Sequence, residues 1–220
     1  MQMKRNELEK YNIAFHKKAK QKHGTCVKAL GWGSRYSQEI RFKAMAEIGF
    51  KSKDTVLDVG CGFGDLAGYL EKENIYLQEY TGIDLDEFFI KQAKEYYKKN
   101  NTHFYNCSLS EFQNNNCKKY DWVVASGIFS FDCKNWDQNV LSTMTTMFSL
   151  AKKGISVNFL SSESKKQNPG FKYVNPDCMV KNNVISLSKN YVIKKNYKVN
   201  DFTLHVYAGE IKNDINNSST

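Results

Sequence analysis

Apolar and polar positions alternate along the middle of the chain in two different ways, and each way predicts a different element. Short apolar runs, typical of buried strands, lie at 54–59, 79–84, 102–106, 120–125 and 154–160. Between them, amphipathic stretches predict helices at about 64–73, 86–99 and 136–151. Strands that alternate with helices form parallel sheets covered on both faces. The pattern therefore predicts a doubly wound α/β domain.

Both ends of the chain depart from this alternation. Residues 4–22, with Leu8, Tyr11 and Phe15 at helical spacing, and residues 36–48 predict two helices before the first strand. Near the other end, two strand-like runs at 191–199 and 201–209 are too close for a crossover helix, so we expect an antiparallel pair. We divide the chain into an N-terminal helical cap (1–50), a core (51–210) and a flexible tail (211–220).

Composition narrows the class of protein. With 220 residues, of which 41% are hydrophobic, the chain is long enough for one sizeable core. No apolar run approaches the roughly 20 residues that span a bilayer, and the N-terminus is charged, so we expect neither a membrane span nor a signal peptide. Six cysteines are scattered without a CxxC motif or a nearby histidine pair, which argues against a metal site and favours a reducing cytoplasm.

The formal charge of +9 leaves the partner open, because a basic protein can bind nucleic acid, a small anion or neither. Lysines are spread along the chain and only three arginines occur, whereas a nucleic-acid surface usually concentrates arginine and aromatic residues on one face. The abundance of lysine, asparagine, tyrosine and isoleucine also fits the coding bias of an AT-rich genome. Nucleic acid is therefore the less favoured partner, and the oligomeric state is left open.

The strongest motif is DTVLDVGCGFGDLAGYL at 54–70, a buried strand that enters a glycine turn and opens a helix. Gly60 and Gly62 lack the Cβ atoms that would keep a ligand from the backbone, and Gly64 permits close packing at the helix start. Asp58 lies two residues before the first glycine, and Asp84 ends the second predicted strand. A carboxylate there can accept hydrogen bonds from both hydroxyls of a ribose. A dinucleotide-binding protein could use a similar turn, so the motif alone does not choose between the two ligands.

At these residues the chain resembles class I S-adenosylmethionine-dependent methyltransferases, whose first motif has the form hhDhGxGxG. The resemblance runs from about residue 29 to 209 and includes KYDWVVASGIFSF at 119–131. It implies a Rossmann-like, seven-stranded, mostly parallel sheet in the order 3-2-1-4-5-7-6, with S-adenosylmethionine as the cofactor. Two helices before the glycine strand and a closing hairpin favour this family over nicotinamide enzymes.

The resemblance also implies roles for single residues. Gly60, Cys61 and Gly62 would contact the amino acid part of the cofactor, Asp84 the ribose and Leu85 the adenine. Ser108 stands where the family often has an acidic residue, which leaves the adenine contacts less defined. The remaining cofactor residues implied by the motif positions are Asp58, Gly64, Leu109 and Ser126.

The segment ALGWGSRYSQEIRF at 29–42 resembles one in small bacterial methyltransferases of sugar or surface-glycan gene clusters, where it folds over the cofactor. On this resemblance Trp32 and Gln38 join the cofactor residues, although Trp32 can equally pack the helix onto the sheet. The acceptor would be a small metabolite with an oxygen or nitrogen nucleophile, such as a sugar, nucleotide-linked or phosphoramidate precursor of bacterial capsular polysaccharide. An RNA-modifying methyltransferase is the alternative.

Candidate catalytic residues come from topology, because ligands of open α/β sheets lie beyond the carboxyl ends of the strands. Asp201 in the closing turn is one candidate, although a turn aspartate often bonds only its own backbone. The loop at 161–175 is longer than typical connections and predicts a lid. It carries Tyr173 and three lysines, Lys165, Lys166 and Lys172, which suit an anionic acceptor, unless it is an ordinary surface loop. His16 is the candidate base on the leading helix.

Overall fold

An eight-stranded sheet forms the centre of the computed structural model, which describes residues 5–195, 197 and 200–210. Its order is β3-β2-β1-β4-β5-β8-β7, and a short β6 pairs with β5. β8 runs antiparallel to β5 and β7, and the other pairs are parallel. The strands are β1 (Thr55–Val59), β2 (Glu79–Asp84), β3 (Thr102–Asn106), β4 (Tyr120–Ala125), β5 (Ala151–Ser161), β6 (Tyr173–Val174), β7 (Tyr191–Lys194) and β8 (Asp201–Tyr207). Without β6 this is the predicted order 3-2-1-4-5-7-6, so the fold prediction is confirmed.

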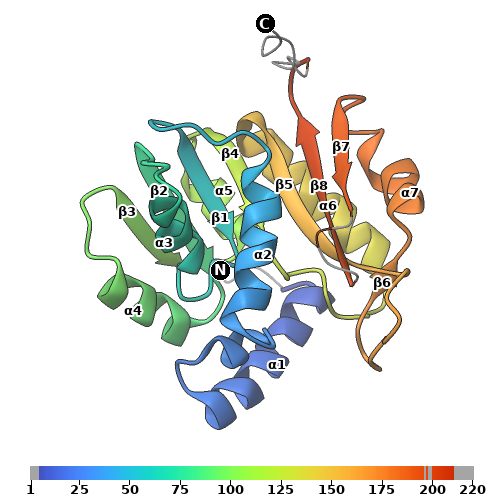
Figure 1. Cartoon of the computed structure of the whole chain (residues 1–220), viewed down its shortest axis with the longest axis horizontal. Helices are drawn as coiled ribbons and strands as arrows, with labels where there is room; N and C mark the ends of the chain where they lie inside the picture. The colour runs from blue at the N-terminus through green and yellow to red at the C-terminus, as the bar shows by residue number, and fades with distance from the viewer. Residues whose placement is uncertain (1–4, 196, 198–199, 211–220) are drawn as a thin grey trace, which may run out of the picture.

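Helices cover both faces of the sheet (Figure 1). They are α1 (Glu7–His23), η1 (Val27–Leu30), α2 (Arg35–Ala46), α3 (Asp65–Lys72), α4 (Glu87–Tyr96), α5 (Leu109–Asn115), α6 (Trp136–Leu150), α7 (Pro176–Met179) and η2 (Val180–Val184). Alternate residues of β1 divide the core between the faces. Val56 packs with residues of α2, α3 and α4, whereas Leu57 and Val59 pack with residues of α5 and α6. This division follows from the twofold side-chain alternation of a strand.

Five short elements were missing from the prediction, α5, β6, α7, η1 and η2, and their shortness explains why. α5 buries only Leu109 and Phe112, too few positions for a periodic pattern to be recognised. Its start did carry a local signal, because Ser108 and Glu111 form a capping box. β6 has two residues and α7 has four. The predicted tail at 211–220 lies outside the described residues.

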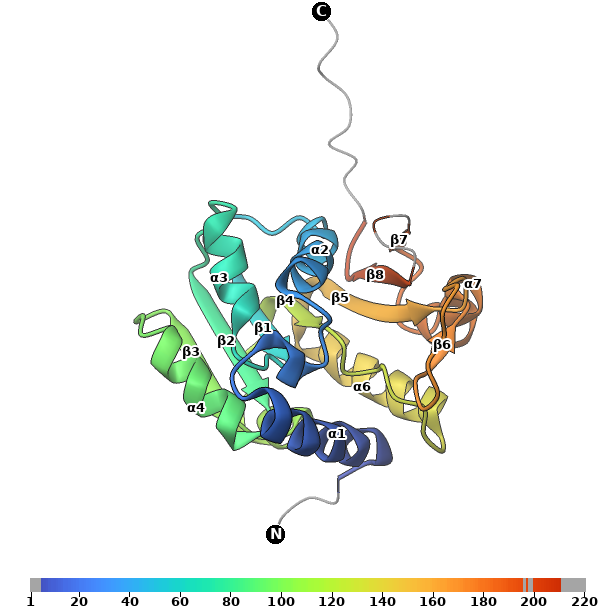
Figure 2. The same ribbon diagram turned by 60° about the horizontal axis from the view of Figure 1, so that its bottom comes forward.

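The helix α1 lies across the carboxyl edge of the sheet, as the two views show together (Figures 1 and 2). Leu8 is buried against the core, and the side-chain amide of Asn12 donates to the Ile128 carbonyl oxygen after β4 at 2.9 Å. Tyr11, which we assigned to the apolar side, is 51% exposed. That part of the prediction is wrong, because a helix that lies over an edge contacts a cavity with its inner side instead of a uniformly apolar sheet face.

Candidate active site

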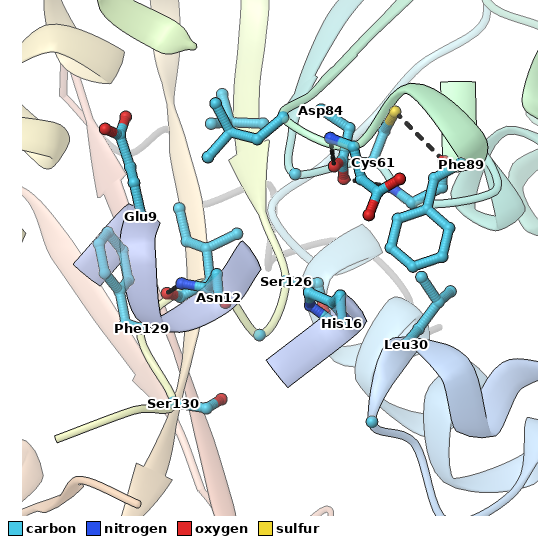
Figure 3. A pocket seen from close by; sticks show the side chains of 18 of the residues that line it. Glu9, Asn12, His16, Leu30, Cys61, Asp84, Phe89, Ser126, Phe129 and Ser130 are labelled. Carbon is cyan, nitrogen blue, oxygen red and sulfur yellow. Dashed lines mark hydrogen bonds between the residues drawn. The ribbon is translucent and has the colours of Figure 1, made fainter. Parts of the chain in front are cut away.

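A cavity opens at the carboxyl edge of β1, β2 and β4, beneath α1. Figure 3 shows Asp84 and Cys61 on one side of it, Glu9 and Phe129 on the other, and Asn12 and His16 of α1 between them. All predicted cofactor residues except Gly64 line this cavity: Trp32, Gln38, Asp58, Gly60, Cys61, Gly62, Asp84, Leu85, Ser108, Leu109 and Ser126. Their convergence agrees with the expected position of a ligand in an open α/β sheet.

The glycine turn is shaped by positive backbone angles and by hydrogen bonds to β2. Gly60 and Gly62 have φ values of +74° and +55°, a region that residues with a Cβ rarely adopt. A Cβ on Gly60 would lie 2.4 Å from Cγ2 of Ile128. The N–H groups of Gly60 and Cys61 donate to the Ile83 carbonyl oxygen at 2.8 and 3.0 Å, which draws the turn against the end of β2. Gly64 caps α3 instead of lining the cavity.

Asp84 is held in one orientation by two backbone donors. The Gly62 N–H donates to Oδ2 at 3.0 Å, and the Asp86 N–H donates to Oδ1 at 2.9 Å. Burial of the carboxyl group raises its pKa, and these two hydrogen bonds act in the opposite direction. The result is a preorganised acceptor of hydrogen bonds at the end of β2, where a hydroxylated ligand can approach it.

Asp58 is a second carboxyl group in the cavity lining, and it is 4% exposed. Burial raises its pKa to about 7, the Tyr80 hydrogen bond lowers it, and the charges of Asp84 and Asp65 raise it further. The Tyr80 hydroxyl donates to Oδ2 of Asp58 at 2.5 Å. A cationic ligand in this cavity would therefore favour the ionised form of Asp58.

Two buried oxygen atoms of the lining have no hydrogen-bond partner within the described part of the chain: Oε1 of Gln38 and Oγ of Ser126. Nε2 of Gln38 donates to Oδ2 of Asp65 at 3.0 Å, so the amide is held with its oxygen left over. A buried polar atom without a partner costs about 1–3 kcal/mol. Both oxygens can accept hydrogen bonds from a ligand, so the lining fits a molecule that carries a donor such as an ammonium group.

Asp201, predicted as a catalytic residue, is held in an ion pair. Its carboxylate accepts from Nη2 of Arg41 at 2.8 and 2.7 Å and from Nε at 3.2 Å, and both side chains are buried. The Arg41 guanidinium also lies 4.6 Å from the ring centroid of Trp32, which packs against Gly127. Asp201 does not belong to the cavity lining among the described residues. The structure therefore does not bring the Asp201 carboxylate to the described lining, and its catalytic role stays a prediction.

The loop at 161–175 reaches the cavity, but through a different residue from the one predicted. The Tyr173 hydroxyl accepts the Asn168 N–H at 3.0 Å and lies outside the lining described here. Lys172 pairs with Asp132 at 3.3 Å, and Lys165 and Lys166 are exposed. Phe171 lines the cavity. The structure therefore does not bring the Tyr173 hydroxyl to the described lining, and its catalytic role stays a prediction.

The inner side of α1 supplies three polar residues at helical spacing, Glu9, Asn12 and His16. His16 was predicted. Glu9 and Asn12 were missed, because only the apolar positions of this helix were used to predict its inner side. Nδ1 of His16 lies 3.0 Å from the Ala29 carbonyl oxygen. A carbonyl oxygen only accepts, so Nδ1 carries the proton of the neutral ring and Nε2 is the basic nitrogen. Burial raises the pKa of Glu9.

The described residues hold neither a cluster of metal ligands nor a membrane-spanning helix. No group of three or more histidine, cysteine, aspartate or glutamate side chains there is arranged to hold a metal ion. None of the described helices has the length and apolar character needed to cross a bilayer.

Comparison with known proteins gives a consistent match. A family model described as a methyltransferase domain matches residues 50–209. The chain is 25% identical over 158 residues to Rv1506c of Mycobacterium tuberculosis, a protein named as a methyltransferase, with 69% of this chain and 92% of that one covered. It is 28% identical over 190 residues to the protein named methyltransferase 235L of Invertebrate iridescent virus 6, covering 82% of this chain and 62% of the viral protein. The solved DhpI complex with S-adenosylhomocysteine superimposes with a TM-score of 0.66 at 11% identity, covering 92% of this chain and 97% of DhpI, so the fold is shared.

Proposed function

Since the chain belongs to the methyltransferase domain family and is an S-adenosylmethionine-dependent methyltransferase, we propose that it methylates an oxygen or nitrogen atom of a small molecule. The observation that carries the proposal is the cavity itself. It begins at the glycine turn and Asp84 and continues under α1 to Glu9 and Phe129 (Figure 3). The cavity therefore offers space for an acceptor next to the cofactor, between α1 and the loop after β4.

Residues of the first half of the cavity fit the cofactor. We assign the ribose hydroxyls to Asp84, whose carboxylate is already oriented by Gly62 and Asp86. We assign the ammonium of the methionyl part to the neighbourhood of Gln38 Oε1 and Ser126 Oγ, the two buried oxygens with no partner within the described residues. When bound, S-adenosylmethionine supplies a methyl group on a positively charged sulfur. The carboxyl groups of Asp58 and Asp84 complement that positive charge.

His16 is the residue we propose as the base. Its Nδ1 proton is directed to the Ala29 carbonyl oxygen, which leaves Nε2 able to take a proton from an acceptor hydroxyl or ammonium group. Its ring is held edge-on by Phe15 and Phe89, with centroids 5.2 and 5.4 Å away. Much of the rate of a methyl transfer can come from alignment of the two reactants, so the base contributes part of the rate and the cavity walls contribute the rest.

The narrower proposal of a bacterial capsular polysaccharide precursor rests on the resemblance of the 29–42 segment. In the structure Trp32 and Gln38 of that segment line the cofactor half of the cavity, so the segment itself carries no information about the acceptor. The alternative of RNA has the net charge of +9 in its favour. No lysine or arginine of the described chain belongs to the cavity lining, which supports a small molecule over a polyanion.

We also propose a reducing, cytoplasmic location, because all six cysteines are free thiols in the structure. Burial raises the pKa of the Cys61 thiol, which keeps this cavity residue protonated. We retain the division into a helical cap at 1–50 and a core at 51–210 as a proposal about the architecture.

The proposal is tested with two measurements. Isothermal titration of the full chain is expected to give tight binding of S-adenosylhomocysteine, and thermal unfolding is expected to shift upward with either form of the cofactor. Incubation with methyl-labelled S-adenosylmethionine and a cell extract, separated into small-molecule and RNA fractions, is expected to label the small molecules. Label in RNA alone would overturn the acceptor class.

The role of His16 has its own matched control on the same helix. His16→Gln is expected to lower the rate of label incorporation without weakening the affinity for S-adenosylhomocysteine, because the ring meets the acceptor proton. His23→Gln, at the end of α1 and outside the described cavity lining, is expected to leave both unchanged. Equal rates for the two variants would contradict the assignment of His16 as the base.

A further inference from the structure

Three phenylalanine rings from separate segments form one wall of the cavity. Phe15 comes from α1, Phe131 from the loop after β4, and Phe171 from the loop at 161–175, and all three belong to the lining. Their ring centroids are 4.9 Å apart for Phe15 and Phe131, 5.1 Å for Phe131 and Phe171, and 6.5 Å for Phe15 and Phe171. Each ring is only partly buried, so a ligand can cover apolar surface that water now reaches.

The three segments are joined by backbone hydrogen bonds, so the wall exists before any ligand arrives. The Asp132 N–H donates to the Gly170 carbonyl oxygen at 3.0 Å, and the Lys172 N–H donates to the Ser130 carbonyl oxygen at 2.9 Å. Phe131 and Phe171 form a β-bridge between these two bonds. The bond from Asn12 to the Ile128 carbonyl oxygen attaches α1 to the same loop. A preformed wall loses little conformational entropy when it binds a ligand.

Apart from His16, the charged side chains that the described residues contribute to the lining are all carboxyl groups, of which Asp86 pairs with Lys20 at 2.5 Å. Four carboxyl groups belong to the lining, from Glu9, Asp58, Asp84 and Asp86, and no lysine or arginine side chain of the described residues does. Asp58, Asp84 and Asp86 lie by the glycine turn, on the side assigned to the cofactor. Glu9 lies on the opposite side, next to Phe129 (Figure 3), where one of its oxygens accepts the Asn6 N–H at 2.9 Å.

The wall of phenylalanine rings and the carboxyl groups of the lining favour some acceptors over others. A phosphate or carboxylate group that entered the cavity would lose its water without gaining a cationic side chain, and it would meet the charge of Glu9, which is costly at low dielectric. A neutral molecule has no such cost, and a protonated amine can offset the loss of its water by pairing with Glu9. A flat apolar body would also pack on the phenylalanine rings, with centroid distances in the usual range of aromatic contacts.

We propose that the acceptor site is the space between Glu9 and the wall of Phe15, Phe131 and Phe171, and that it takes an uncharged or amine-bearing molecule with a flat apolar body. This inference rests on the proposed function, because it identifies the second substrate of the same cavity. It replaces the expectation of an anionic acceptor, which depended on lysines of the 161–175 loop that face elsewhere. Lys172 pairs with Asp132, and none of the three lysines is part of the lining.

The test uses three indole probes of nearly equal size and different charge: tryptamine, tryptophol and indole-3-acetate. Their binding to the full chain saturated with S-adenosylhomocysteine is measured by ligand-observed nuclear magnetic resonance. Tryptamine and tryptophol are expected to bind. Indole-3-acetate is expected to bind at least about tenfold more weakly, a difference of about 1.4 kcal/mol or more. Equal or tighter binding of indole-3-acetate would overturn the proposal, and so would a lack of binding by all three probes at millimolar concentration.

Variants then locate the probe. Two variants test the wall: Phe171→Ala, and the milder Phe15→Leu, which keeps apolar volume. Each is expected to weaken tryptophol binding about fivefold or more, while the affinity for S-adenosylhomocysteine stays within about twofold. Tyr76→Ala removes an aromatic ring that is 60% exposed outside the cavity lining, and it is expected to change neither affinity. Glu9→Gln is expected to remove any preference for tryptamine over tryptophol. Unchanged tryptophol binding in both phenylalanine variants would place the site elsewhere.

The order of the measurements separates the two proposals. Binding of S-adenosylhomocysteine is measured first on each sample. A chain that fails this step contradicts the proposed function, whereas a chain that binds S-adenosylhomocysteine but prefers the anionic probe contradicts only the acceptor class.

Discussion

In the half of the cavity that we assign to the cofactor, one stretch of chain from Val56 to Asp84 supplies the glycine turn and the oriented carboxylate, whereas the half that we assign to the acceptor is assembled from side chains of three distant segments. In the first half, Gly60 and Cys61 bond to Ile83 and Gly62 bonds to Asp84, so one turn and one strand end determine the geometry. In the second half, α1, the loop after β4 and the 161–175 loop meet through ring contacts and a few long-range hydrogen bonds.

This difference predicts two kinds of sensitivity. When a backbone turn packs closely against its surroundings, a single added methyl group can force the turn to move. A wall of side chains tolerates many single changes, but it depends on the tertiary contacts that bring its segments together. The buried pair of Arg41 and Asp201, which connects α2 to β8, is a tertiary contact of the same kind outside the cavity lining described here.

Asp201→Ala is expected to lower the free energy of unfolding by about 3–5 kcal/mol, because it leaves the buried Arg41 guanidinium without its carboxylate. Urea denaturation followed by circular dichroism measures this effect. Asp201→Leu combined with Arg41→Met removes both charges and is expected to recover a large part of the loss. A single variant within about 1 kcal/mol of the wild type would mean that the ion pair does not hold α2 to β8.

Gly60→Ala is expected to weaken S-adenosylhomocysteine binding about 100-fold, or about 2.7 kcal/mol. The added Cβ must lie at a φ of +74° and 2.4 Å from Cγ2 of Ile128, so the turn moves away from the ligand. Titration calorimetry gives the affinity. Gly24→Ala is the matched control, since Gly24 also has a positive φ, of +56°, but no atom within 4 Å of the added Cβ. If both variants bind equally well, the close approach at Gly60 is not what shapes the cofactor half.

His205 on β8, which lies against Ser156 of β5, makes the stability of the fold sensitive to acid. It is fully buried, and burial is the main reason that its pKa is lowered to about 3. The unfolded chain takes up this proton near pH 6.5, so stability is complete above that pH and is lost progressively as the pH falls toward 3. At pH 5 the expected loss from this residue is about 2 kcal/mol.

The measurement is the free energy of unfolding at several pH values between 7 and 5. His205→Asn is expected to flatten this dependence, whatever its effect on stability at pH 7. His103→Gln, at a partly exposed position of β3, is expected to keep the wild-type slope. A wild-type slope in the His205 variant would show that another group is responsible for the pH dependence.

The smallest effect is a proton released on cofactor binding. The pKa of Asp58 is raised to about 7, so near pH 7 roughly half of the molecules carry this proton. A cationic cofactor favours the carboxylate, and binding of S-adenosylmethionine is therefore expected to release up to about half a proton at pH 7. Calorimetry in two buffers of different ionisation enthalpy measures the release. Asp58→Asn is expected to abolish it, and an unchanged release in that variant would assign the proton to another group.

Local patterns were enough to predict most of the fold and to identify the glycine turn and Asp84, which line one side of the cavity. Strand β2 (Glu79–Asp84) and strand β4 (Tyr120–Ala125) have the bounds predicted from their apolar runs, because a strand buried on both faces needs consecutive apolar residues. The glycine turn was recognisable for a related reason. Its geometry depends on residues within a few positions of one another, and only glycine suits the positive φ of Gly60 and Gly62.

Patterns in the sequence predicted most of the helices and strands, a resemblance implied the sheet order, and the glycine motif identified residues that line one side of the cavity. Only the tertiary structure decided that Asp201 pairs with Arg41, that Phe171 and not Tyr173 reaches the cavity, and that Glu9 and Asn12 face it. The physical reason is that a side chain's partner depends on how distant segments pack, and nothing adjacent to Asp201 in the chain indicates an arginine 160 residues away. Local sequence largely determines backbone conformation, whereas the free energy of packing selects the contacts that form the acceptor half.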